Sequence, residues 1–144
     1  GDPSTYPIVK REWVKPGAFI SLPSLANIDE GMQQPDVRKV MDNRGLYEAW
    51  AAEAPKPTHA HVPIIGCKFL DMVDQGVIDS DELSDLGDVV SRVRPGRESE
   101  EQIVVLSVGG MPVEDVAWGT EIYRRARAAG IGTQLRLWDA PLLR

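Results

Sequence analysis

The chain has 144 residues, of which 42% are hydrophobic and 26% are charged. Such a chain is long enough for one globular domain with its own core, and these fractions argue against disorder. Its formal net charge of −6 disfavours nucleic acid and anionic membranes as main partners, because phosphate binding needs clustered Lys and Arg.

The first third of the chain predicts two short strands separated by polar loops. Residues 1–16 are turn-rich and lack an initiator methionine, so we expect a loop, or a short helix around Val9–Val14, in a chain cut from a larger protein. The apolar run Ala18–Ser24 predicts a strand. The following "NIDEGMQQP" predicts a loop, and "PDVRKVMDN" predicts a turn or short helix that leads into a short strand.

The middle of the chain predicts three helices joined by loops. Gly45–Ala54 consists of strong helix formers, and "CKFLDMVDQG" places apolar residues on one side and ends at Gly76. The Pro-rich "PKPTHAHVP" connects these two. "DSDELSDLGDVVSRV" predicts the third helix, because a cap residue and first-turn acids precede an apolar stripe at helical spacing. That stripe comprises Ile78, Leu83, Leu86, Val89 and Val90.

The last third contains the clearest strand and the clearest helix. "IVVLSV" is typical of a strand buried on both faces of a parallel sheet. In "PVEDVAWGTEIYRRARAAG", a first-turn proline, early acids and late arginines all indicate a helix that ends at Gly130. "TQLRLWD" predicts a final strand or an extended tail. We therefore expect one α/β domain over residues 1–144 with a mostly parallel sheet.

Ligands of such sheets bind beyond the carboxyl ends of the strands, which here means Leu22–Leu25 and Ser107–Gly110. The two glycines after Ser107 permit a tight turn, or they let a ligand approach the backbone beside the serine hydroxyl. Both interpretations stay open. A phosphate is disfavoured, because Glu114 and Asp115 already place negative charge in the following helix.

Other chemistry-bearing residues form no convincing cluster. His59 and His61 could chelate a metal but lack further ligands at suitable spacing, so an exposed loop pair is favoured and no metal site is predicted. The single cysteine, Cys67, excludes an internal disulfide and indicates a buried small hydrophobe. Neither a signal peptide nor a run near the roughly 20 residues of a membrane span is visible, so a cytoplasmic protein is expected.

Three stretches together resemble the second half of the ornithine cyclodeaminase/mu-crystallin family: "VKREWVKPGAFISLPS", "PGRESEEQIVVLSVGGMPVEDVAWG" and "IYRRARAAGIGTQLRLW". The resemblance spans nearly the whole chain. It implies the second half of a Rossmann-like, mostly parallel sheet with flanking helices. It also implies that the glycine fingerprint, the ribose-binding acid and the dimerising part lie in a first half that these residues do not contain.

The resemblance implies roles for several residues at the two strand ends. Ser107 matches a serine that contacts the nicotinamide, and Val108 matches its neighbour beside the substrate. Pro23, Ser24 and Leu25 fall where the family backbone passes the nicotinamide. The family's catalytic aspartate and lysine align with Ala26 and Glu30, which is a departure from the family pattern. A small shift of the loop would let Asn27 or Asp29 take that role, and we choose Asp29 as the predicted catalytic carboxylate.

The resemblance also implies a function. It points to part of an NAD- or NADP-dependent amino-acid dehydrogenase, imine reductase or cyclodeaminase, acting on a small amino-acid or imine substrate. The chain alone would be inactive, and it would form a homo-oligomer or need its first half. Two alternatives stay open: a non-catalytic cofactor- or ligand-binding protein of the same fold, and a subunit that pairs with a separate first-half chain.

Overall fold

A computed structural model describes residues 5–23, 25–110 and 112–135. The chain forms two compact units, residues 1–110 and residues 111–144. The expectation of one domain over residues 1–144 stays a prediction.

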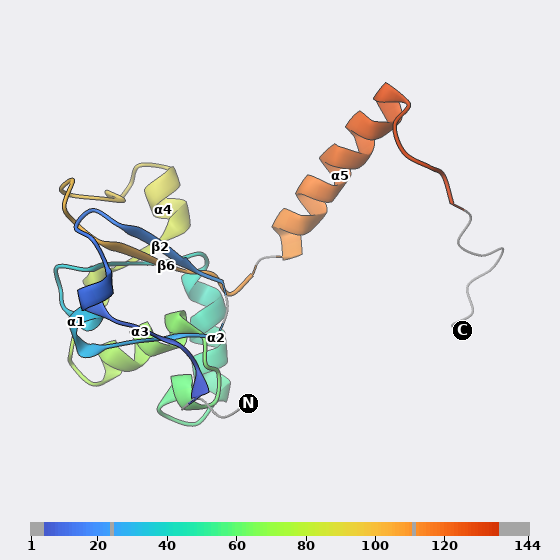
Figure 1. Cartoon of the computed structure of the whole chain (residues 1–144). Helices are drawn as coiled ribbons and strands as arrows, with labels where there is room; N and C mark the ends of the chain where they lie inside the picture. Colours follow the sequence, from blue (N-terminus) through green and yellow to red (C-terminus); the bar gives the residue numbers. More distant parts are fainter. Residues whose placement is uncertain (1–4, 24, 111, 136–144) are drawn as a thin grey trace. The chain divides into compact units, whose positions relative to one another are not determined.

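A four-stranded parallel sheet forms the centre of the larger unit, with the strand order β2-β6-β4-β5. Its strands are β2 (Phe19–Leu22), β4 (Arg38–Met41), β5 (Leu83–Asp85) and β6 (Val104–Ser107). The strand that comes last in the sequence, β6, lies between β2 and β4, and Figure 1 shows it beside β2. A separate parallel pair consists of β1 (Ile8–Val9) and β3 (Asn27–Ile28). The predicted α/β class with a parallel sheet is therefore confirmed.

The helices of this unit cover both faces of the sheet, with α2 and α3 on one side and α4 on the other (Figure 1). The α-helices are α1 (Glu30–Gln33), α2 (Arg44–Glu53), α3 (Ile65–Asp74) and α4 (Leu86–Val90). Short 3-10 helices are η2 (Arg11–Trp13), η3 (Thr58–Ala60) and η4 (Ser80–Glu82). The Asn43 side chain caps α2 by accepting the amide of Leu46 at 3.3 Å, and Gly76, at φ 69°, follows α3 as predicted.

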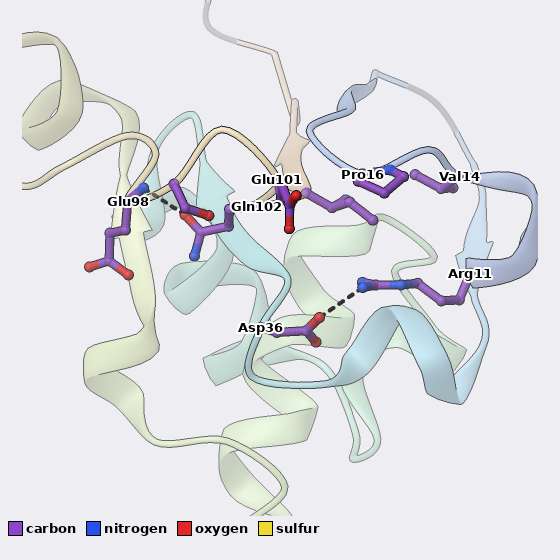
Figure 2. Close-up of a pocket in the computed structure, with 9 residues that line it drawn as sticks. Arg11, Val14, Pro16, Asp36, Glu98, Glu101 and Gln102 are labelled. Carbon is purple, nitrogen blue, oxygen red and sulfur yellow. Dashed lines mark hydrogen bonds and ion pairs between the residues drawn. The ribbon is translucent and has the colours of Figure 1, made fainter.

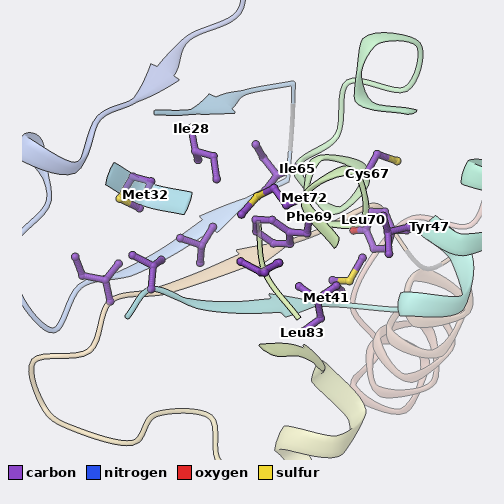
Figure 3. Packing of buried hydrophobic residues seen from close by; sticks show 14 residues of the cluster. Ile28, Met32, Met41, Tyr47, Ile65, Cys67, Phe69, Leu70, Met72 and Leu83 are labelled. Carbon is purple, nitrogen blue, oxygen red and sulfur yellow. The ribbon is translucent and has the colours of Figure 1, made fainter. Parts of the chain in front are cut away.

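The core lies between the sheet and α3 (Figure 3). Alternation along the strands produces it: Val105 points to this side, whereas Val104 and Leu106 line an apolar groove on the α4 side. Phe69 of α3 is fully buried in the cluster. Burial of such side chains contributes about 1.5–3 kcal/mol each, so this layer is what holds the sheet and its edges in place.

The single helix predicted over residues 78–93 is wrong. Its apolar stripe is divided between η4, the edge strand β5 and the short helix α4. Two aspartates set these breaks: Asp79 forms a capping box with Glu82 before β5, and Asp85 accepts the amide of Gly87 to start α4. Pairing of β5 with β4 outweighs the helical period of the segment.

The predicted loop over residues 27–35 is also wrong, because it contains β3 and α1. Around Val9–Val14, the short-helix alternative is confirmed as η2, which follows the end of β1. The strand predicted over Ala18–Ser24 and the helix predicted over Gly45–Ala54 are confirmed as β2 and α2.

The smaller unit contains α5 (Pro112–Ala129), with Glu114 and Asp115 in its first turn and Gly130 after its end at φ 65°. The helix predicted here is confirmed. Residues 133–135 of the predicted final strand have no regular structure, and residues 136–139 lie outside the described part. Within the described part of the chain, no helix combines the length and the apolar character that crossing a membrane requires.

Candidate active site at the carboxyl edge of the sheet

The two predicted ligand-binding segments meet at one edge of the sheet. Leu22 ends β2 in register with Ser107 at the end of β6, and the Val108 amide donates to the Leu22 carbonyl at 3.1 Å. Pro23 and Leu25 are exposed beyond β2, whereas Ser24 lies outside the described residues. Val108 is half-buried. The edge thus brings Leu22, which Pro23 follows, beside Ser107 and Val108.

An aspartate that follows β4 organises this edge. The Asp42 carboxylate accepts the Tyr47 hydroxyl at 2.6 Å and the Asn43 amide at 2.9 Å through one oxygen. Its other oxygen accepts the amides of Gly109 at 2.9 Å and Gly110 at 3.1 Å. The Asp42 amide in turn donates to the Ser107 carbonyl at 3.0 Å. One residue therefore holds the chain from Ser107 to Gly110, which is the turn that leaves β6.

The Ser107 side chain is fully buried and points into the same network. Its Oγ accepts the Gly66 amide at 2.8 Å and lies 3.0 Å from the Tyr47 hydroxyl oxygen. Because the only hydroxyl proton of Tyr47 goes to the Asp42 carboxylate, which can only accept, Ser107 donates to Tyr47. Both hydrogen-bonding functions of Ser107 are thus engaged within the protein, and a ligand at this edge would meet its main chain.

Tyr47 explains two of the glycines. It is fully buried, with the ring of Trp50 edge-on at a centroid distance of 5.5 Å. A Cβ on Gly109 would lie 3.0 Å from the Tyr47 hydroxyl oxygen, and a Cβ on Gly66 would overlap the Tyr47 ring. Gly110 differs, since it adopts φ 94° with open space around it. The glycines after Ser107 make room for Tyr47 and for a tight turn.

The electrostatics of the edge disfavour a phosphate. The two consecutive amides of Gly109 and Gly110 would suit an oxyanion, but the Asp42 carboxylate already accepts them. Burial, together with the hydrogen bond to Asp42, raises the pKa of the Tyr47 phenol, so it stays protonated. What the edge offers a ligand is an uncharged, small-residue turn backed by one buried negative charge.

Asp29, the predicted catalytic carboxylate, lies in a different setting. Its carboxylate accepts the Arg11 amide through both oxygens, at 3.2 and 3.1 Å, and caps α1 by accepting the Met32 amide at 3.0 Å. The Arg11 side chain extends from there to Asp36, which precedes β4 at the opposite edge of the sheet. The structure therefore gives Asp29 a capping role, and its catalytic role stays a prediction.

We expect Asp29→Ala to lower the free energy of unfolding by about 1 kcal/mol, because α1 loses its cap and the Arg11 amide loses its acceptor. Urea unfolding of the two proteins measures this difference, with Glu30→Ala in the exposed first turn of α1 as control. Equal stability of Asp29→Ala and the native protein would contradict the capping role.

The two histidines do not form the exposed pair predicted from the sequence. His61 is exposed, but His59 is buried, and burial lowers the pKa of its imidazole. Asp71 of α3 holds this turn by accepting the amides of Thr58 at 2.7 Å and His59 at 2.8 Å. No group of three or more metal-ligating side chains occurs within residues 5–23, 25–110 and 112–135. Cys67 is buried as predicted, and burial raises the pKa of its thiol to about 11.

A cavity of about 440 Å³ lies at the amino ends of the strands rather than at the carboxyl edge (Figure 2). It contains Arg11, which donates to Asp36 at 2.7 Å, and two further acids, Glu98 and Glu101. It shares no lining residue with the edge formed by Leu22 and Ser107. Its position does not fit the general rule for ligands of parallel sheets.

The family of this chain follows from its similarity to known proteins. The model of the ornithine cyclodeaminase/mu-crystallin family matches residues 2–130. The chain belongs to this family. The resemblance proposed from the three sequence stretches is therefore confirmed, and the carboxyl edge described above lies wholly within the matched residues.

Three relatives show how much of a family member the chain represents. It is 26% identical to the alanine dehydrogenase of Archaeoglobus fulgidus over 94% of this chain and 39% of that protein. It is 28% identical to the N-((2S)-2-amino-2-carboxyethyl)-L-glutamate dehydrogenase of Staphylococcus aureus, over 92% of this chain and 35% of that protein. An archaeal alanine dehydrogenase dimer with bound NAD aligns with a TM-score of 0.60 and 25% identity, over 94% of this chain and 39% of that one. The chain thus spans less than two-fifths of these relatives.

Sequence reasoning missed Asp42 and Tyr47, the residues that shape the edge. One signal for Asp42 was available, since it directly follows the predicted strand in "PDVRKVMDN", at a position where carboxyl-end residues gather. No sequence spacing links Tyr47 to Ser107, which are 60 positions apart.

Proposed function

We propose that this chain is part of the nucleotide-binding region of an NAD- or NADP-dependent enzyme that acts on an amino acid or its imine. Family membership supports the reaction class, and the solved dimer with bound NAD is a related dehydrogenase. The observation that carries the proposal is the carboxyl edge, where β2 and β6 end side by side at Leu22 and Ser107.

The edge fits the nicotinamide end of such a cofactor rather than its phosphates. Gly110 has open space where a Cβ would lie, which suits the flat face of a ring, and the amides of Gly109 and Gly110 are occupied by Asp42. When bound, the nicotinamide supplies or accepts a hydride at a substrate carbon. We propose that Pro23, Ser24, Leu25 and Ser107 contact it through the main chain, and that Val108 lies beside the substrate.

The residues of this chain would act mainly by positioning. The network of Asp42, Tyr47 and Ser107 fixes the turn before any ligand arrives, so little ordering remains to be done on binding. A carboxylate would be needed to move the proton at the imine nitrogen, and Asp29 stays our proposal for it. Release of its cap at α1 would have to accompany that role.

The engaged carboxylate of Asp29 supports a second candidate function. Both of its oxygens accept backbone amides, so Asp29 is engaged in capping rather than free to move a proton. The chain would then belong to a non-catalytic protein that binds NAD(P) or a small ligand. For either function we propose a cytoplasmic homo-oligomer, or an assembly with a separate first-half chain.

Cofactor binding tests the proposal on the full-length protein, expressed with every residue that its reading frame encodes. We expect saturable NADH or NADPH fluorescence, and a loss of affinity of about tenfold or more in Val108→Trp, because the larger ring would occupy the turn. Val93→Trp, at an exposed loop position, is the matched control. No response to either cofactor would refute the proposal. Oxidation of the reduced cofactor with a keto acid and an amine would exclude the non-catalytic alternative.

A further inference from the structure

Asp42 is a buried carboxylate without a cationic partner among the described residues. It is 6% exposed, and none of the ion pairs within residues 5–23, 25–110 and 112–135 includes it. Its four hydrogen-bond donors are a phenol and three backbone amides, all of them uncharged. The negative charge is therefore solvated by dipoles but not neutralised.

The cations that lie closest in sequence are directed elsewhere. The Arg44 guanidinium binds Glu48 at 2.7 Å and the Ser80 hydroxyl at 2.7 Å. Lys39, on the same strand, donates to the carbonyls of Gln34 at 2.8 Å and Val37 at 2.9 Å, before the amino end of β4. Neither cation offsets Asp42 at the carboxyl edge of the sheet.

An uncompensated buried charge creates a field that water screens poorly. Here the field originates beneath the Gly109–Gly110 turn, since the same carboxylate oxygen accepts both amides. The negative charge would act electrostatically on a ligand bound at this turn, across the peptide groups and without direct contact with the carboxylate. The effect would favour whichever form of the ligand carries a positive charge at that end.

We infer that Asp42 makes the proposed nicotinamide site prefer the oxidised, positively charged ring over the reduced, neutral ring. This inference rests on the proposed function. It assigns Asp42 a positioning and charge-setting role, because it holds the turn and acts on the ring through space. The same carboxylate that keeps phosphate off the two amides thus selects the charge state of the group that binds in its place.

The experiment compares equilibrium dissociation constants of the oxidised and the reduced cofactor in the full-length protein near pH 8. The quantity of interest is their ratio, which a purely structural role would leave unchanged. In Asp42→Asn we expect the oxidised form to lose about 3- to 10-fold in affinity relative to the reduced form, as removal of one partly buried charge predicts.

Two variants of Asn43 keep the test independent of the folding of Asp42→Asn. Asn43 is exposed and caps α2, and both Asp and Ser are good cap residues at that position. Asn43→Asp adds a second negative charge next to Asp42 and should shift the ratio about twofold further toward the oxidised form. Asn43→Ser, which adds no charge, should leave the ratio at the native value.

Each outcome bears on a stated claim. Equal loss of affinity for both forms in Asp42→Asn, or an unchanged ratio in Asn43→Asp, overturns the inference and leaves the proposed function intact. If Asp42→Asn does not fold, the ratios measured for Asn43→Asp and Asn43→Ser decide whether the inference stands. Absence of binding for both forms in the native protein refutes the proposed function, and the inference with it.

Discussion

Gly66→Ala is expected to destabilise the larger unit by about 3 kcal/mol or more, because the added methyl group would overlap the ring of Tyr47. The Tyr47 ring cannot shift away from the added methyl group, since it is fully buried and its hydroxyl is hydrogen-bonded to Asp42 and Ser107. Gly66 also donates its amide to Ser107 at 2.8 Å. The substitution should therefore disturb the carboxyl edge together with the core.

A matched helical glycine provides the control. Gly45 lies in the first turn of α2, where a Cβ would meet only the Asn43 side chain at 3.4 Å, an ordinary contact. Gly45→Ala should be neutral or more stable by up to about 1 kcal/mol, since alanine favours the helix. Chemical denaturation measures both variants. Equal stability of Gly66→Ala and Gly45→Ala would show that Tyr47 is not confined as described.

Asp71→Ala is expected to lower the free energy of unfolding by about 3 kcal/mol. Asp71 is 2% exposed and is the acceptor for two buried backbone amides, those of Thr58 and His59. Each hydrogen bond to a charged acceptor contributes about 1.5–3 kcal/mol, and removing the acceptor leaves both donors unsatisfied. The turn containing η3 would detach from α3.

Asp74→Ala, one turn later on α3, is the control for this prediction. Asp74 pairs with Lys56 at the surface, where an ion pair contributes at most about 1 kcal/mol. Hydrogen exchange at Thr58 and His59 locates the effect, because these amides should lose protection in Asp71→Ala alone. Retained protection there would contradict the role of Asp71.

Strong local patterns predicted β2, β4, β6, α2 and α3 of the larger unit. The run "IVVLSV" predicted β6, and the helix formers of Gly45–Ala54 predicted α2, because each element is consistent with its own sequence period. β5 was not predicted, because three residues are too few to show the alternation of a strand. Leu83, Leu86 and Val89 instead follow one another at helical spacing. The pairing of β5 with β4 is a tertiary contact that no local pattern contains.

The candidate site was predictable only in its location. The rule for parallel sheets placed it at Leu22–Leu25 and Ser107–Gly110, where the two strand ends do meet. Its internal order depends on Asp42 after β4, Tyr47 in α2 and Gly66 in α3, which are distant in the sequence. The choice of Asp29 followed from its position in a loop, and the sequence did not reveal that Arg11 would donate its amide to that carboxylate.

The central place of β6 has a consequence for how the protein is made. β2 and β4 do not pair with each other, and both depend on β6 as their common neighbour. A ribosome must therefore translate β6 before β2 and β4 can be joined through it, and until then the edges of these two strands that will face β6 lack that partner. Sheets assembled from such distant segments fold slowly. We expect nascent chains that stop short of Val104 to be the species that chaperones and proteases recognise.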